Sequence, residues 1–296
     1  MLRFAKWSGI VLVGLLAVIV LAGVVVYFIG GARLNRTYDI QPAAVAVPVG
    51  DAAAIQRGKH VAEAFGLCTM CHGDNLAGKV LEDDPVFSIL VSANLTSGKG
   101  GVGATRSDVD FVRAIRHGVR ADGIAIPFMP SKYYNRLSDA DTGALIAYIR
   151  SLPPVDNELP SSNLRVLGRV LLVAGQLGGF FAVEEIDHDS PRPPDADPGV
   201  TAEYGKYLAT ICTLCHGSDL AGGAIPDYPP VLAPNITSQG GPGHWSAEQF
   251  MSTLRTGRTP EGNQLNNENM PWQAVGKMTD DELRAIYLFL KSLPAT

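Results

Sequence analysis

Two short stretches of this chain combine residue types that can hold an iron-bearing cofactor. Each reads Cys-x-x-Cys-His, and together they use all four cysteines of the chain. Two thiols three positions apart on one helical turn can both reach one edge of a porphyrin, and the imidazole of the next residue then falls under the iron. A zinc site or a disulfide is the alternative, but neither requires a His directly after the second Cys in both stretches. We therefore predict two covalently bound haems c, held by Cys68, Cys71 and His72 and by Cys212, Cys215 and His216.

The sequence around each motif is one pattern that occurs twice. His-Gly-x-x-Leu-Ala-Gly follows each attachment site, Asn-[Leu/Ile]-Thr-Ser and a glycine-rich loop come next, and Ser-Leu-Pro closes each copy. Helix-start signals recur in both copies, because a Ser or Thr precedes an acidic or amide residue by three positions at Ser107, Ser138, Ser246 and Thr279. We therefore expect two small all-helical domains, repeat 1 (residues 55–154) and repeat 2 (residues 201–296).

The alignment of the two repeats also indicates the sixth ligand of each iron. Only Met129 and Met270 align with each other; each precedes a Pro and lies 57 or 54 residues after its proximal His. A thioether opposite an imidazole suits electron transfer and raises the reduction potential. The remaining methionines apart from Met1 are Met70, Met251 and Met278, which we interpret as an attachment-loop residue and two core residues. Ligation by two histidines is the alternative, but none of the other histidines repeats: His60, His117, His188 and His244.

Several repeated polar residues could bind the haem propionates, which are anions that need partners where they are buried. The candidates are Asn94, Asn235, Arg116, Arg255 and Trp245. The alternative is that the Asn-x-Thr-Ser segments only shape turns and that the two arginines are solvated.

The N-terminal segment, residues 1–36, has the composition of a membrane anchor. Trp7 to Phe28 carries no charge over 22 residues, and a helix of that length reaches about 33 Å, enough to cross the hydrocarbon core. A cleaved signal peptide is the alternative, but its apolar run is usually shorter, and no Ala-x-Ala site follows here. We expect an uncleaved transmembrane helix, although the basic residues on its two sides orient it only weakly.

The segments between these parts have their own composition. Residues 37–54 are predicted to form an extended tether, and residues 155–200 a linker. The apolar stretch from Leu164 to Val183 indicates a helix against the domains, the membrane surface or a partner, and Glu184 to Pro198 an exposed acidic spacer. Beyond residue 36, 20 Lys and Arg face 29 acidic residues, a net charge of −9, so nucleic acid is not an expected partner.

The paired blocks over residues 55–296 resemble the membrane-anchored multihaem cytochrome c subunits of bacterial periplasmic alcohol, gluconate and related sugar or aldehyde dehydrogenase complexes. The resemblance implies an all-α fold with one N-terminal transmembrane helix and two tandem class I cytochrome c domains. It implies an inner-membrane protein with its haem domains in the periplasm. It also implies a relay, not an enzyme, that takes electrons from a dehydrogenase or respiratory complex to quinone, a soluble cytochrome or an oxidase. Subunits of that group commonly carry three haems, whereas this chain has two motifs.

Two other functions fit a dihaem chain. A peroxidase-like enzyme needs one open iron position, and the Met-Pro pair in both repeats argues against it. A subunit of a terminal oxidase or of a larger respiratory or photosynthetic complex would have the same relay chemistry with different partners.

Overall fold

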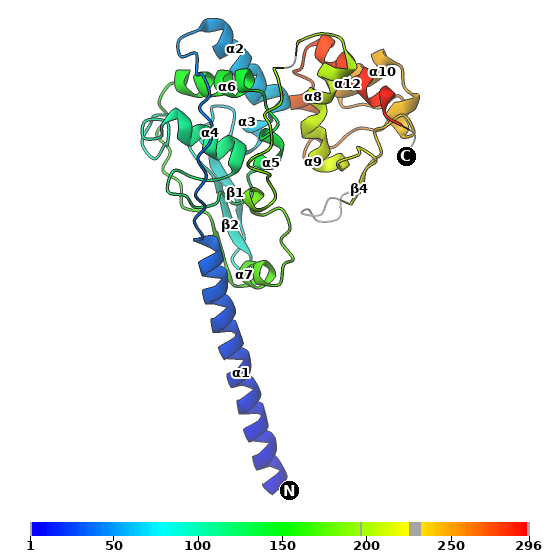
Figure 1. The fold of residues 1–296 in the computed structure, drawn as a ribbon. Coiled ribbons are helices and arrows are strands. Elements are labelled where there is room, and N and C mark those ends of the chain that lie inside the picture. Colours follow the sequence, from blue (N-terminus) through cyan, green and yellow to red (C-terminus); the bar gives the residue numbers. More distant parts are fainter. Residues whose placement is uncertain (1, 196, 225–231, 295–296) are drawn as a thin grey trace.

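The structure is a computed structural model that describes residues 2–195, 197–224 and 232–294. A long N-terminal helix, α1 (Leu2–Leu34), projects from a head in which repeat 1 lies next to α1 and repeat 2 lies beside repeat 1 (Figure 1). The chain is mostly helical, as predicted, and it also contains short strands that the sequence patterns did not predict. Among the described residues, α1 alone is long and apolar enough to cross a membrane, over Gly9–Leu34, and a signal sequence has the same features.

The two repeats use the same order of helices. Repeat 1, with the residues just before it, contains α2 (Ala52–His60), the π-helical turn η1 (Val61–Phe65), α3 (Cys68–His72), β1 (Lys79–Asp83), β2 (Ser88–Ser92), α4 (Asp108–His117), α5 (Ser131–Tyr134) and α6 (Asp139–Ser151). The linker adds β3 (Asn163–Leu164), α7 (Val166–Val173) and η2 (Ala182–Glu184). Repeat 2 contains α8 (Ala202–Leu208), η3 (Ala209–Cys212), α9 (Thr213–His216), β4 (Gly223–Ala224), β5 (Leu232–Ala233), η4 (Gly241–His244), α10 (Ala247–Thr256), α11 (Trp272–Val275) and α12 (Asp280–Ser292).

The predicted helix starts are confirmed. Each of the four Ser and Thr side chains accepts a hydrogen bond from the backbone N–H three residues on, at the first turns of α4, α6, α10 and α12. In three of them the side chain at the third position also bonds back to the cap. The exception is Asp141 in α6, whose carboxylate binds Arg57 instead. These caps fix where each helix begins.

In each repeat the first and last helices cross at a glycine. A Cβ on Gly58 in α2 would lie 1.9 Å from the carbonyl oxygen of Ala144 in α6. A Cβ on Gly205 in α8 would lie 1.9 Å from the carbonyl oxygen of Ala285 in α12. Because the helix backbones touch at these points, only glycine fits both positions.

We predict that Gly58→Ala or Gly205→Ala lowers the free energy of unfolding by about 3 kcal/mol, the upper end of the usual overpacking range, since a backbone carbonyl cannot rotate away. Urea unfolding of the haem-loaded chain, followed by haem absorbance, measures the loss. The control is Gly241→Ala, where an added Cβ meets nothing within 4 Å. Unchanged stability in both crossing variants would contradict the helix packing described above.

The connection into the attachment motif differs between the repeats. Repeat 1 has three more residues here, and its longer connection contains the five-residue π-helical turn η1, after which the Gly66 N–H donates to the Val61 carbonyl at 2.7 Å. Leu67 then takes a left-handed φ of 54° before α3 begins. Repeat 2 makes the same connection with the short 3-10 turn η3. A π-helical turn absorbs extra residues without breaking the helix, so both motifs start from equivalent helices.

The linker packs on repeat 1. Its strand β3 pairs antiparallel with β2, which gives a three-stranded sheet in the order β1-β2-β3. A second apolar cluster joins residues of the linker with residues of repeat 1: Leu90, Val119, Ala125, Leu164, Leu172, Phe180, Phe181 and Val183. The expected helix in the apolar stretch is present as α7, but it covers only eight residues.

The segment from Glu184 to Pro198 is exposed at its first residues, as predicted, but these residues are also attached to other parts of the chain. The Glu184 carboxylate accepts hydrogen bonds from Arg33 at 2.7 Å and from the Tyr38 hydroxyl at 2.8 Å. The tether before repeat 1 contains neither helix nor strand between Tyr38 and Asp51, and it is attached, since the Tyr38 N–H donates to the Gly123 carbonyl at 2.8 Å. Glu184 therefore connects the spacer to α1 and to the tether, and the tether in turn is bonded to repeat 1.

A polar network joins the two repeats. The Arg57 guanidinium donates to both carboxylate oxygens of Asp141, at 2.6 and 2.9 Å, and to Glu282 of repeat 2 at 3.2 Å. The Tyr207 hydroxyl of repeat 2 donates to Asp141 at 2.6 Å, and His60 lies 2.7 Å from the second oxygen of Glu282. Both carboxylates are buried. Because each repeat contributes a buried carboxylate and a partner for the other's, the two repeats are held in one orientation.

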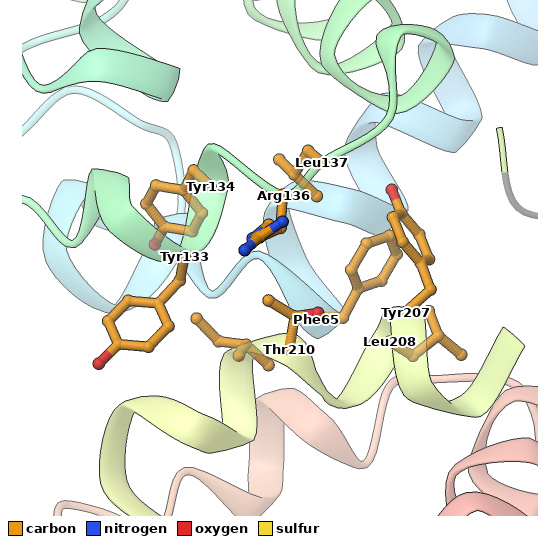
Figure 2. Close-up of a pocket in the computed structure, with 9 residues that line it drawn as sticks. Phe65, Tyr133, Tyr134, Arg136, Leu137, Tyr207, Leu208 and Thr210 are labelled. Atoms are coloured by element: carbon orange, nitrogen blue, oxygen red, sulfur yellow. The ribbon is translucent and has the colours of Figure 1, made fainter. Parts of the chain in front are cut away.

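An aromatic cleft lies beside this network at the junction of the repeats. Figure 2 shows Phe65 of repeat 1 and Tyr207 of repeat 2 close together at this junction, and their ring centroids are 6.4 Å apart in an edge-on arrangement. The cleft is lined by Phe65, Tyr133, Tyr134, Arg136, Leu137, Tyr207, Leu208, Thr210 and Ile211. Phe65 and Tyr207 thus form an aromatic contact between the two repeats.

Candidate haem-binding sites

The structure places each Cys-x-x-Cys-His motif on a short helix, α3 or α9, with all four thiols free. The imidazole Nδ1 of His72 lies 2.8 Å from the Ala93 carbonyl, and that of His216 lies 2.8 Å from the Pro234 carbonyl. A carbonyl only accepts, so Nδ1 carries the hydrogen in both rings and Nε2 keeps a free lone pair. This tautomer is the one that an iron ligand needs, and the carbonyl fixes the ring direction. Both imidazoles therefore fit the proximal position.

Burial changes the acid–base behaviour of these groups. It lowers the pKa of His72 and of His216 below the usual range, which keeps both rings neutral. It also raises the pKa of Cys68 and Cys212 to about 12. A neutral buried thiol differs from the low-pKa thiolate of redox dithiol motifs. The donor set therefore suits a covalently attached haem.

The His-Gly-x-x-Leu-Ala-Gly segment folds into the same closed turn after each imidazole. The carbonyl of His72 accepts from the Gly78 N–H at 2.8 Å, and that of His216 accepts from the Gly222 N–H at 2.9 Å. Between them Leu76 and Leu220 take left-handed φ values of 53° and 60°. Both leucines are buried, so packing offsets the strain of that conformation. The same turn in both repeats produces the same site geometry.

The two Met-Pro loops also have the same backbone. The carbonyl of Met129 accepts from the N–H two residues on at 2.8 Å, and that of Met270 does so at 2.6 Å. The prolines between have φ and ψ of −80° and 50° and of −74° and 57°, the values of an inverse γ-turn. Both methionine side chains are half-buried and pack against the core, as do Cys68 and Cys212. Their role as sixth ligands stays a prediction.

The two Met-Pro loops differ in the hydrogen bond that holds each of them in place. The Phe128 N–H donates to the carbonyl of Phe180 in the linker at 2.8 Å, and Phe128 takes a left-handed φ of 63°. In repeat 2 the Met270 N–H donates to the nearby Asn266 carbonyl at 2.9 Å. One loop is therefore held by a distant segment and the other by its own residues.

The other methionines lie as the repeat alignment predicted, and two of the other histidines have protein partners. Met278 is a core residue with 1% of its surface exposed, Met251 is half-buried against the core, and Met70 is 38% exposed. His60 binds Glu282, and His188 binds His117.

The two asparagines shape turns. The Asn94 side-chain oxygen accepts from the Thr96 N–H at 3.0 Å, and the Asn235 oxygen accepts from the Thr237 N–H at 2.8 Å. Asn94 also donates to the Val155 carbonyl at 2.8 Å. These bonds correspond to the turn-shaping alternative, and the propionate role of the asparagines stays a prediction.

The two arginines join helices. A guanidinium nitrogen of Arg116 at the end of α4 lies 2.6 Å from Asp139 at the start of α6. Arg255 at the end of α10 lies 2.6 Å from Asp280 at the start of α12. Arg116 is fully buried, so it is not solvated, and its Nε has no hydrogen-bond acceptor among the described residues. The ion pair with Asp139 gives Arg116 a structural role, since it joins α4 to α6. A role toward a haem propionate stays a prediction.

Trp245 was the indole expected to bind a haem propionate, but Trp272 is the one whose N–H lacks a protein partner among the described residues. The Trp245 N–H donates to Glu261 at 2.8 Å, so it has a protein partner. Trp272, directly after Met270-Pro271, instead has a buried N–H with no acceptor in the described part of the chain. A buried N–H without a partner is costly, and a haem propionate would supply the acceptor. Sequence reasoning missed Trp272 because its counterpart in repeat 1 is Ser131.

A histidine pair attaches the linker to repeat 1. The Nδ1 atoms of His117 and His188 lie 2.8 Å apart, Nε2 of His188 lies 3.1 Å from the Val183 carbonyl, and Arg192 donates to Nε2 of His117 at 3.2 Å. Only one arrangement satisfies all three contacts: His188 donates to the carbonyl, and the neutral His117 donates to His188 and accepts from Arg192.

Burial, with the nearby charge of Arg192, lowers the pKa of His117 from 6.5 to about 4. The unfolded chain therefore binds a proton below pH 6.5 that the folded chain does not bind until about pH 4. We predict that the free energy of unfolding falls as pH falls through this window, by on the order of 3 kcal/mol from this group. Urea unfolding at both ends of the window measures it.

His117→Gln should remove this part of the pH dependence. His244→Gln, at an exposed position, is the matched control and should keep it. If His117→Gln and the unmodified chain lose stability equally between pH 6.5 and 4, the neutral histidine pair is wrong.

These features define a class of protein built to hold covalently bound haem. A profile of the cytochrome c family matches residues 55–153 and 202–294. The chain belongs to the cytochrome c family.

Three relatives show where such chains occur. The chain is 31% identical to the fructose dehydrogenase cytochrome subunit of Gluconobacter japonicus, over 82% of this chain and 53% of the relative. It is 29% identical to the cytochrome c subunit of the quinone alcohol dehydrogenase of Gluconacetobacter polyoxogenes, over 83% and 57%. It is 28% identical to the gluconate 2-dehydrogenase cytochrome c subunit of Pantoea cypripedii, over 86% and 62%. The chain thus spans little more than half the length of these relatives.

Proposed function

We propose that this chain is a membrane-anchored electron-transfer cytochrome with two covalently bound haems. It lies on the periplasmic side of a bacterial inner membrane, and α1 is its single span. It receives electrons from a dehydrogenase or respiratory complex and passes them to quinone, a soluble cytochrome or an oxidase. Substrate oxidation takes place in a partner subunit. The observation that carries this proposal is the identical donor set in both repeats: two thiols, a carbonyl-oriented imidazole and a half-buried methionine.

The residues of each site would hold the cofactor and shield it. Cys68 and Cys71, and their counterparts in repeat 2, supply two thiols for covalent attachment. His72 presents Nε2 because its Nδ1 is held by Ala93, and Met129 offers a soft thioether from a fixed turn. With one imidazole and one thioether ligand, haem iron supplies a one-electron couple at raised potential.

The contact between the repeats supports the relay. The buried network around Arg57 and the aromatic contact of Phe65 with Tyr207 hold the two repeats in one orientation. A fixed orientation keeps the distance between two bound groups constant, which a relay requires. The relatives are named as cytochrome subunits of dehydrogenases, which supports a dehydrogenase as the electron donor.

The test is a haem count followed by an optical and EPR redox titration of the purified full chain. We expect two covalent haems per chain, both low-spin, and no spectral change on addition of peroxide. One covalent haem would overturn the dihaem proposal. A high-spin haem that reacts with peroxide would instead favour a peroxidase-like enzyme with one open site.

A further inference from the structure

The linker helix α7 exposes an apolar side. Val166, Leu167 and Val170 are 67, 43 and 40% exposed, and their spacing places them on one side of the helix. The opposite side, including Leu172, is buried against repeat 1 and α1. The apolar surface extends to the β1–β2 turn, where Val86 is 55% exposed and its carbonyl accepts from the Leu167 N–H at 3.0 Å. We name these four residues the α7 face.

The position of α7 along α1 is fixed by Arg169. Its guanidinium lies over the Tyr27 ring at 4.0 Å and donates to the Tyr27 carbonyl at 2.9 Å. A Cβ on Gly30 would lie 2.9 Å from the Cβ of Arg169, so the two helices touch at this point. Figure 1 shows α7 at the lower end of the head, where α1 leaves it. The α7 face therefore lies at the level of residues 27–31 of α1.

That level coincides with a membrane boundary if α1 spans a bilayer. The 20 residues from Gly9 to Phe28 form a helix about 30 Å long, which is the thickness of the hydrocarbon core. None of these residues is buried. Arg33 and Arg36 follow within eight residues, at the height of lipid headgroups, and each pairs with Glu184. A helix attached at Tyr27 and Gly30 then lies at the edge of the hydrocarbon.

We propose that the α7 face is a second membrane contact, which lies in the interface of the same bilayer that α1 crosses. The inference rests on the proposed anchor role of α1. A bilayer is the occupant that fits, because α7 exposes apolar side chains at the level of Tyr27 and Gly30. On a spanning α1, this is the depth where headgroups meet acyl chains. Two contacts fix the tilt of the head, whereas α1 alone would let it rotate. Repeat 1 is then held at the membrane.

The test uses site-directed spin labels on the full, haem-loaded chain in nanodiscs of phosphatidylethanolamine and phosphatidylglycerol. Labels are attached one at a time to Val170→Cys in the α7 face, to Val18→Cys in α1 and to Val49→Cys. Val18 and Val49 are 64 and 67% exposed. Val49 lies three residues before α2, and Figure 1 shows α2 at the end of the head away from α1. Power saturation with oxygen, which dissolves in lipid, and with a water-soluble nickel chelate reports where each label lies.

We expect the label at position 170 to resemble that at position 18, with a severalfold higher ratio of oxygen to nickel-chelate accessibility than the label at position 49. A label at position 170 that is as accessible to the nickel chelate as that at position 49, while position 18 reports lipid, overturns this inference and leaves the anchor intact. A label shielded from both reagents at position 170 also overturns it, because a protein would then cover α7. If position 18 itself reports water, the anchor proposal fails.

Discussion

Replacing Met129 or Met270 by His is expected to lower one of two reduction potentials by about a few tenths of a volt and to leave the other unchanged. Imidazole is the harder ligand and stabilises the ferric state, whereas a thioether favours the ferrous state. The two Met-Pro loops lie in different repeats, before α5 and before α11, so each variant should affect its own repeat alone. A redox titration with optical detection measures both potentials.

The control for these variants is Met70→Leu. Met70 lies between the two cysteines of its own motif and is 38% exposed, so its loss should change neither potential. If Met129→His and Met270→His both leave the two potentials unchanged, the methionines are not ligands. The predicted relay would then lack its basis in ligand chemistry.

Arg57→Met should be the most destabilising single change at the contact between the repeats. The methionine retains most of the apolar stem, but the buried carboxylates of Asp141 and Glu282 lose their shared cation. Removing one member of a buried ionic network costs about 3–5 kcal/mol, because the remaining charges stay uncompensated. Urea unfolding of the haem-loaded chain at neutral pH measures the loss.

Acid should reduce the difference between this variant and the unmodified chain. Burial on its own raises the pKa of Glu282, but hydrogen bonds from His60 and from the Thr279 N–H, with the charge of Arg57, lower it to about 2. A carboxyl with a lowered pKa stabilises the fold above its unfolded pKa of about 4.3, and this stabilisation is lost as pH falls toward 2. Without Arg57 the ionised Glu282 contributes less stabilisation, so the variant loses less stability than the unmodified chain when the pH falls.

Lys99→Met is the matched control for the loss of a cation. Lys99 and Glu158 form an exposed ion pair, at 69 and 62% exposure, and such pairs contribute about 0–1 kcal/mol. If Arg57→Met costs no more than Lys99→Met, the network does not hold the repeats together.

Local patterns in the sequence predicted what is local in the structure. The caps at Ser107, Ser138, Ser246 and Thr279 start helices as expected, because capping involves residues three positions apart. The duplicated motif predicted two equivalent sites, and the repeated Met-Pro predicted two equivalent loops. In each case the information lies within one turn, or in a comparison of two copies.

What depends on distant contacts could not be predicted. His60 and Arg57 have no counterparts that show their role, because their partner Glu282 lies more than 200 positions away in the other repeat. The pairing of β3 with β2 and the binding of His188 to His117 depend on how the linker folds back. Composition indicated only an apolar helix followed by an exposed spacer, and neither of these contacts. Trp272 gave no signal, since its unpartnered N–H appears only once its surroundings are assembled.

The different supports of the two methionine loops have a kinetic consequence. The loop of repeat 1 can open only if the hydrogen bond between the Phe128 N–H and the Phe180 carbonyl breaks and the linker lets go. The loop of repeat 2 needs only its own short turn at Asn266 to open. The opening rate of each methionine loop, and therefore the lifetime of its closed state, depends on a different contact in each repeat. Amide hydrogen exchange should therefore be slower at Phe128 than at Met270. Two repeats that share one predicted ligand set thus differ in how long each methionine loop stays closed.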